Sequence, residues 1–401
     1  MRKIEISFLT LICFFNISVL KSQSYHDILG QEGDRLNTIT TAVPFLLIAP
    51  DARAGSMGEV GAATTPDINS MHWNPAKYIF IDGDYGVTIS YTPWMRKLIH
   101  DINLAYVSGY YKFDKQQAIA ASLRYFTLGE IQFTGMTPDE NLGTFSPTEF
   151  AIDVAYNRLF GDNFSFAIAL RYIYSNLSGG ATVGTGHAET KPGQSVAGDI
   201  AIFYKNDFKI NKQDARIAFG MDISNIGAKI TYSEIGYRAF LPTNLRIGPS
   251  FTYNIDDFNA ITVAFDLNKL LVPTPPYYAY DSINEEYVIA KGKDPHRSVV
   301  DAIFSSFWDA PDGFKEELHE VIFCGGVEYN YAEQFFVRAG YFNEHKTKGN
   351  RKFATFGVGV RYNIFDLSFS YLVPFEQHHP LENVLRFTMT FNFFKPQNKP
   401  K

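Results

Sequence analysis

The chain has 401 residues and a formal net charge of −6, and it carries no basic patch, which argues against a nucleic-acid partner. Aromatic residues make up 16% of the sequence, including 36 Phe and 24 Tyr, yet the mean hydropathy is only −0.12. This mixture is typical of a transmembrane β-barrel, because the outer face of a barrel meets lipid while its lining stays polar or small.

Residues 1–22 are predicted to be a signal peptide that exports the chain. Arg2 and Lys3 precede an apolar run, 6–20, that is too short to span a bilayer as a helix. Cleavage near Ser22 would discard Cys13 and leave Cys324 as the cysteine of the mature chain, so that no disulfide can form within it. After the signal no stretch of 18 apolar residues follows, and no membrane-spanning helix is expected.

Residues 23–83 are predicted to form a plug, a segment that precedes the barrel and threads its lumen. The segment does not alternate in polarity, and Gly, Ala and Pro are denser in it than elsewhere in the chain. Gly55, Gly58 and Gly61 recur every third residue, which allows tight turns and close approach of the backbone. Nucleotide binding is not expected, because no Lys-Ser or Lys-Thr pair follows these glycines and no βαβ unit surrounds them.

Residues 84–394 are predicted to form an antiparallel transmembrane β-barrel of fourteen strands. Segments of about 9–13 residues alternate in polarity, which is the length and period of a tilted membrane strand. The first strand must pair with the last, because an open sheet edge in hydrocarbon leaves backbone groups unpaired. In order, the segments are 84–92, 100–112, 116–128, 147–159, 163–175, 194–205, 214–226, 242–254, 258–269, 321–331, 334–344, 352–363, 365–375 and 383–394.

The connections distinguish a barrel from a soluble sandwich, which would also alternate. Tight turns, such as 161–162 and 255–257, alternate with long loops, such as 129–146 and 270–320. One rim of turns and one of loops is typical of an outer-membrane barrel, whose short turns face the periplasm and whose long loops face outward. An even strand number then places both termini on the periplasmic side, where residues 395–401 form a short tail.

The longest loop, 270–320, opens with a run rich in Pro and Tyr and continues into a helical stretch near 298–321. We expect either a partner-docking or pore-capping element, or a lid packed on its own barrel. Aromatic anchors carry most of the energy of an interface, although Trp94 could instead belong to an interfacial aromatic girdle. The candidate partner-binding residues are Pro93, Trp94, Pro275, Tyr277, Tyr278, Phe304, Phe307 and Trp308.

Charged side chains on the inward face of the strands are expected to pair with one another and stiffen the wall. These side chains are Arg124, Arg171, Arg216, Asp153, Asp199, Asp222, Arg338 and Arg361. No catalytic residue, metal site or cofactor is predicted, because no His lies in an HExxH motif, no GxSxG motif occurs and no calcium or zinc pattern is present. The chain is therefore predicted not to be an enzyme, although a hydrolase with Ser and His on separate strands stays an open alternative.

The run ARAGSMGEVGAATTPDINSMHWNPA, residues 52–76, resembles the plug signature of the FadL family of outer-membrane barrels. That signature ends in an Asn-Pro-Ala element, which here is Asn74, Pro75 and Ala76. Within the FadL family, residues 41–64 and 67–78 are similar to the PorV family, small barrels of the type IX secretion system of Bacteroidetes. The resemblance implies a fourteen-stranded barrel with a short plug.

The same resemblance implies a role as a cargo shuttle in protein secretion. The chain would bind the folded C-terminal signal domains of secreted cargo as they leave the large translocon barrel. It would carry them to the sortase-like surface complex that attaches cargo to lipopolysaccharide. The alternative is a FadL-like channel for uptake of hydrophobic small molecules, which predicts an apolar pocket under the plug and a lateral opening at a strand kink.

Overall fold

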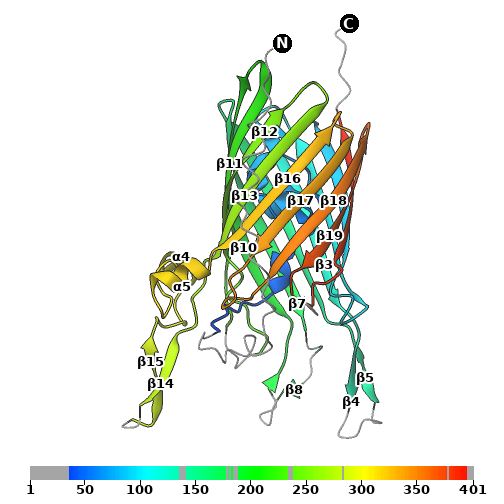
Figure 1. Cartoon of the computed structure of the whole chain (residues 1–401). Coiled ribbons are helices and arrows are strands. Elements are labelled where there is room, and N and C mark those ends of the chain that lie inside the picture. The colour runs from blue at the N-terminus through cyan, green and yellow to red at the C-terminus, as the bar shows by residue number, and fades with distance from the viewer. Residues whose placement is uncertain are drawn as a thin grey trace. The chain divides into compact units, whose positions relative to one another are not determined.

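Fourteen antiparallel strands close into one barrel in the computed structural model, which confirms the predicted fold (Figure 1). The structure describes residues 36–134, 141–177, 179, 182–183, 188–233, 238–281, 284–376 and 379–394. The predicted signal peptide and the predicted tail, 395–401, lie outside these residues. From Asn37 onward, the described chain forms one compact unit.

The barrel strands follow one another around the wall in chain order. The seam pairs β1 with β20, from Tyr85 opposite Phe393 to Tyr91 opposite Phe387, as closure in lipid requires. The strands are β1 (Tyr85–Pro93), β2 (Ile102–Lys112), β3 (Gln117–Leu128), β6 (Thr148–Phe160), β7 (Phe164–Asn176), β10 (Gly193–Ile210), β11 (Gln213–Gly227), β12 (Asn244–Asn254), β13 (Asn259–Leu270), β16 (Ile322–Tyr331), β17 (Phe335–Asn343), β18 (Lys352–Tyr362), β19 (Phe365–Pro374) and β20 (Leu385–Phe393).

Side chains alternate between the lumen and the outer face along each strand, as the period of two dictates. In β7, Ala167 and Ala169 are buried in the lumen, whereas Ile168 and Leu170 are 50% and 64% exposed on the outside. Large apolar side chains that stay exposed around a closed sheet are those that lipid covers. The outer face of the barrel is therefore its membrane face.

The two rims of the barrel differ. Short turns, from 113–116 to 363–364, connect the strands at what we call the turn rim, and longer segments connect them at the loop rim. The β10–β11 hairpin extends further past the turn rim than predicted, because β10 continues to Ile210 instead of ending at residue 205. The hairpins at the loop rim pair β4 (Ile131–Thr134) with β5 (Asn141–Phe145), β8 (Thr182–Val183) with β9 (Ala188–Glu189), and β14 (Tyr277–Asp281) with β15 (Glu286–Lys291).

The longest loop departs from the single helical stretch predicted near 298–321. Two short helices form, α4 (Val299–Ser305) and α5 (Phe314–His319), and the β14–β15 hairpin precedes them. Pro311 and Gly313, which has a φ of 73°, interrupt the helical path between α4 and α5. Among the described residues, no helix has the length and apolarity needed to cross a membrane.

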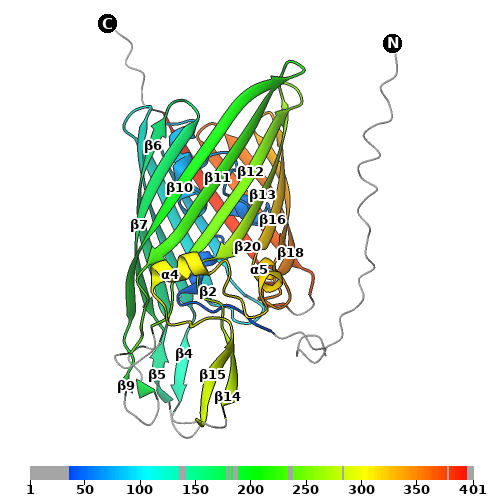
Figure 2. The same ribbon diagram turned by 90° about the vertical axis from the view of Figure 1, so that its left-hand side faces the viewer.

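The plug lies inside the barrel, where its blue ribbon is visible between the strands in Figures 1 and 2. It consists of short helical turns, namely η1 (Pro44–Leu47), α2 (Ala52–Gly55), α3 (Ser70–Trp73) and η2 (Pro75–Phe80). Its described start lies at the loop rim, where Asn37 N donates to Thr347 O at 3.0 Å. Its end lies at the turn rim, where Asp84 N donates to Phe393 O at 2.9 Å.

Candidate functional site

The Asn-Pro-Ala element joins two segments of the plug, one at Ala62 and one at Ala76, to the barrel wall. Asn74 Oδ1 accepts from Ala76 N at 3.0 Å and caps η2, where Pro75 takes the first position. Asn74 Nδ2 donates to Ala62 O in the plug and to Ile202 O in β10, both at 2.9 Å. One side chain therefore satisfies three backbone groups on three segments.

The predicted plug glycines lie where the plug touches neighbouring groups most closely. Gly58 has a φ of +70°, and a Cβ there would lie 2.5 Å from Tyr341 O. A Cβ at Gly61 would lie 2.4 Å from the Trp73 ring, and one at Gly55 would lie 2.7 Å from Arg386 Cδ. A glycine of the wall approaches the plug equally closely, since a Cβ at Gly340 would lie 2.0 Å from Gly58 N. Backbone therefore packs directly on backbone at this point of the lumen.

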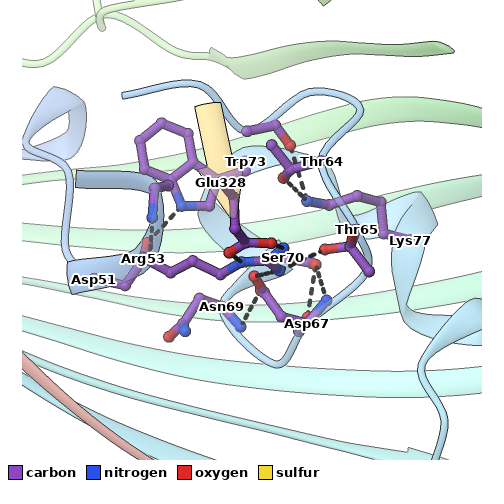
Figure 3. A network of polar contacts seen from close by, with 12 residues as sticks. Asp51, Arg53, Thr64, Thr65, Asp67, Asn69, Ser70, Trp73, Lys77 and Glu328 are labelled. Carbon is purple, nitrogen blue, oxygen red and sulfur yellow. Dashed lines mark hydrogen bonds and ion pairs between the residues drawn. The ribbon is translucent and has the colours of Figure 1, made fainter. Parts of the chain in front are cut away.

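A buried ion-pair cluster fixes the plug to β16 and β17 (Figure 3). Arg53 in the plug binds Glu328 in bidentate fashion, at 3.0 and 2.9 Å, and Asp67 in the plug at 2.8 Å. Glu328 also accepts from Arg338 Nε at 2.6 Å. Because these charges are removed from water, each depends on its partners for solvation.

Other wall arginines donate to carbonyl groups of the plug. Arg124 Nη1 donates to Leu46 O at 2.6 Å, Arg246 Nη1 to His72 O at 3.1 Å, and Arg386 Nε to Ala49 O at 3.1 Å. Plug carbonyls that helices and strands leave unpaired thus find donors on the wall. The charged side chains of the wall therefore bind the plug as well as one another.

Six of the eight predicted lining charges are buried in the lumen, namely Arg124, Arg171, Asp153, Asp199, Asp222 and Arg338. Arg171 forms ion pairs with Asp153 and with Asp199, the latter at 2.9 Å. The other two, Arg216 and Arg361, are partly exposed and pair with Asp207 and Asp366. They lie near the turn rim, where water reaches the side chains.

The lumen of the described barrel is packed around the plug. A cavity of about 10 Å³ beside His72 and Arg171 has room for about one water molecule. A larger cavity of about 400 Å³ opens at the loop rim, above the plug. Glu59, Glu320, Glu344, Lys348 and Arg351 contribute charge to it, and its apolar lining consists of Ile39, Pro44, Leu47, Ile48, Trp94, Leu270, Ile322, Phe353 and Leu381.

Two irregularities interrupt the wall without opening it. The register of β10 against β11 shifts between Gly198 and Ile200. In β12, Gly248 and Pro249 fall in a gap of the pairing with β13. Pro249 has no N–H to donate, and a Cβ at Gly248 would lie 1.9 Å from Phe265 O, so β12 approaches β13 closely at a position where only glycine fits. All four strands remain neighbours in the closed sheet.

Residues 271–321, which we call the rim excursion, are anchored to the barrel by buried ion pairs. Lys269 Nζ lies 2.9 Å from Glu317 Oε2 and 2.6 Å from Glu320 Oε2, and Lys348 Nζ lies 2.6 Å from Glu316 Oε1. Burial is the largest single influence and would raise the pKa of Glu316, but hydrogen bonds from Lys348, Asp312 N and Asn37, together with the Lys348 charge, lower the pKa below its usual value. These contacts make the excursion part of the folded rim.

Burial has the opposite outcome at Asp309, between the two helices of the excursion. It raises the pKa of this carboxyl to about 6, although the Arg297 guanidinium 3.5 Å away favours the charged form.

The predicted partner-binding residues do not form one surface. Trp94 lines the rim cavity directly after Pro93 ends β1, and Pro275 O accepts from Asn37. The remaining five divide between the β14–β15 hairpin (Tyr277 and Tyr278) and the α4 region (Phe304, Phe307 and Trp308). The sequence analysis did not identify Tyr287 and Phe314, which are 73% and 76% exposed. The hairpin that carries Tyr287 could have been predicted from the two β-prone runs, YYAY at 277–280 and EYVIA at 286–290.

The described parts of the chain contain no group of three or more His, Cys, Asp or Glu side chains placed to hold a metal ion. Cys324 is a buried free thiol on the lumen side of β16. The absence of enzymatic activity stays a prediction.

A closed fourteen-stranded barrel with an apolar outer face, one loop rim and a plug in its lumen has the architecture of a plugged outer-membrane β-barrel. The chain belongs to the PorV family: the family description "Type IX secretion system protein PorV" matches residues 31–277, which is more than half of the chain. It is therefore a barrel of the type IX secretion system family, located in the outer membrane.

Solved structures of similar fold include hydrocarbon transporters and a FadL homologue. The Pseudomonas putida toluene transporter TodX is 12% identical, with 86% of this chain and 98% of that chain covered and a TM-score of 0.47. The Ralstonia pickettii toluene transporter TbuX is 11% identical (86% and 98% covered, TM-score 0.43), and a Pseudomonas aeruginosa FadL homologue is 12% identical (89% and 100% covered, TM-score 0.42). At these values the likeness concerns the fold alone. No curated protein sequence matches the chain.

Proposed function

We propose that this barrel binds the folded C-terminal signal domains of secreted cargo at its loop rim. It carries them from the large translocon barrel to the sortase-like surface complex that attaches cargo to lipopolysaccharide. Membership of the PorV family supports a role in type IX secretion. The observation that carries the binding mode is the plug in the lumen: its side chains are buried against the wall, and the cavity of about 400 Å³ at the loop rim is far too small for a folded domain, so a cargo domain would stay at the rim.

The β14–β15 hairpin is the part of the rim best suited to a protein partner. It projects away from the barrel (Figures 1 and 2). Tyr278 and Tyr287 are 49% and 73% exposed, and Val288 and Ile289 are exposed beside them. Exposed aromatic side chains on a rigid hairpin supply contact area at low cost in conformational entropy, which is why Tyr is frequent among binding hot spots.

Replacing both hairpin tyrosines, Tyr278→Ser with Tyr287→Ser, is expected to weaken capture of a purified cargo signal domain by about 30-fold or more, since one hot-spot residue contributes about 2 kcal/mol. The measurement is a titration of the detergent-solubilised barrel against the immobilised domain. The matched control is Phe208→Ser with Ile210→Ser, two exposed apolar residues of the β10–β11 hairpin on the opposite rim. Equal affinity of both double variants would contradict docking at the loop-rim hairpin.

The proposal also requires the loop rim to face the cell exterior. Asn284→Cys in the β14–β15 turn should react on intact cells with a membrane-impermeant maleimide, whereas Asp162→Cys at the turn rim should react only after the outer membrane is permeabilised. Cys324 is 4% exposed and contributes no background. Labelling of Asp162→Cys alone on intact cells would show the reverse orientation.

The rim cavity favours one alternative, uptake of a hydrophobic small molecule. Its volume of about 400 Å³ and its apolar lining suit a small ligand. Mass spectrometry of lipid extracted from the purified barrel separates the two functions: a bound hydrophobic compound that is lost on Trp94→Ala would support uptake.

A further inference from the structure

The rim excursion lies on the outside of the barrel wall, directly beyond its lipid-facing stripe. On β13, Phe265 and Leu267 point outward and are 58% and 43% exposed. Lys269 is the next residue on the same face, roughly 7 Å further along the strand. It is buried, because Glu317 of α5 and Glu320, which follows α5, cover it at 2.9 and 2.6 Å, and the Phe307 ring lies 5.9 Å from its Nζ.

The two helices of the excursion turn an apolar face away from the protein. On one side of α4, Ala302 and Val299 pack against Phe240 and Val272. The other side leaves large apolar residues exposed, and α5 adds two more; the set comprises Val300, Phe304, Phe307, Trp308, Phe314 and Leu318, each between 42% and 76% exposed. In Figure 1 both helices lie beside the barrel and not across its mouth.

We propose that α4 and α5 form an interfacial anchor that lies in the headgroup region of the outer membrane, with these six side chains buried among lipid. The patch is continuous with the membrane face of the wall, since Leu267 and its partner across the sheet, Phe323, are the exposed outward residues next to the excursion. Helices with a broad apolar face that lie at a membrane surface bind it in this way. The proposal assigns Phe304, Phe307 and Trp308 to lipid instead of to a protein partner.

The charges around the patch indicate a surface anchor that does not depend on anionic lipid. Between residues 291 and 320, seven acidic side chains (Asp294, Asp301, Asp309, Asp312, Glu316, Glu317 and Glu320) are nearly balanced by four basic ones (Lys291, Lys293, Arg297 and Lys315) and by Lys269 and Lys348, which pair with the three glutamates. Lys293 Nζ lies 5.4 Å from the centre of the Trp308 ring. A Trp with a neighbouring Lys is an arrangement suited to the membrane–water interface, where the ring enters lipid and the ammonium group stays in water. Neutral phosphatidylcholine should therefore be sufficient to bury the patch.

Trp308 provides the probe for the test. The Trp94→Phe variant is reconstituted into phosphatidylcholine vesicles with or without bromine on the acyl chains, which quenches indole fluorescence on contact. Trp73, 2% exposed in the plug, stays as a constant background. Two reference variants on a Trp94→Phe and Trp308→Phe background set the scale: Phe265→Trp in the lipid-facing stripe and Tyr287→Trp on the projecting hairpin. All are aromatic exchanges at exposed positions, and heat-modifiable migration on gels checks that each barrel is folded.

The expected result is quenching of Trp308 closer to that of Phe265→Trp than to that of Tyr287→Trp, and stronger with bromine near the headgroups than near the chain ends. Removing Trp308 should abolish this signal. Quenching closer to that of Tyr287→Trp would overturn the anchor and show a patch that faces water, free for a protein partner.

Discussion

Replacing Glu328 with glutamine is expected to lower the free energy of unfolding by about 3–5 kcal/mol, the effect of removing one partner from a buried ion pair. Glu328 is the carboxylate shared by Arg53 of the plug and Arg338 of the wall. The amide keeps the volume but not the charge, so Arg338 loses its buried counter-ion. Urea unfolding in detergent micelles, followed by intrinsic fluorescence, measures the change.

Asp214→Asn is the matched control for this prediction. Asp214 pairs with Lys209 at 3.0 Å, but both side chains are 67% exposed, so the same chemical change should shift stability by no more than about 0.5 kcal/mol. If the two variants unfold at the same urea concentration, the plug is not held by the buried cluster.

Replacing Gly340 with valine is expected to displace the plug from the wall. The first atom of the new side chain would lie 2.0 Å from Gly58 N, and backbone cannot give way as a flexible side chain does. We expect a loss of about 3 kcal/mol, the upper end of the usual overpacking cost. A displaced plug should also raise the ion conductance of single barrels in a planar bilayer, which gives a second measurement.

Gly325→Val serves as the control on the neighbouring strand. A Cβ at Gly325 would meet the Phe265 ring at 3.4 Å, which is an ordinary contact on the outer face. Stability and conductance should match those of the unaltered protein. A closed, equally stable barrel for Gly340→Val would mean that the plug and wall are not in contact at Gly58.

Local patterning predicts the wall well, because each strand is defined by neighbours two residues apart. The predicted strand 163–175 corresponds to β7, Phe164–Asn176, and its alternation is seen in Phe164, Ile168 and Leu170, which are exposed on the outer face. Lipid on one side and a lumen on the other impose this alternation along the whole strand. The end of the β10–β11 hairpin does not follow this rule, since residues 207–210 are exposed on both faces of β10 and no alternation is required there.

The contacts of the plug could not be predicted from local sequence patterns. The glycine spacing and the Asn-Pro-Ala element are visible in the sequence, but their partners are not: Arg53 meets Glu328 275 positions away. The two helices of the rim excursion were not predicted separately for a similar reason, since α5 is stabilised by Lys269 of β13 and by Lys348 of the loop between β17 and β18. Pairings of this kind join residues far apart in the sequence, which local patterns cannot identify.

The route of the plug restricts the order in which the protein assembles. Its described part enters at the loop rim near Asn37 and reaches the opposite rim before the first strand begins at Tyr85. If the barrel closed first, this segment would have to be threaded from one rim to the other and then reach contacts as close as that of Gly58 with Gly340. We therefore expect the segment to be in place while the sheet is still open, so that the pairing of β1 with β20 encloses it.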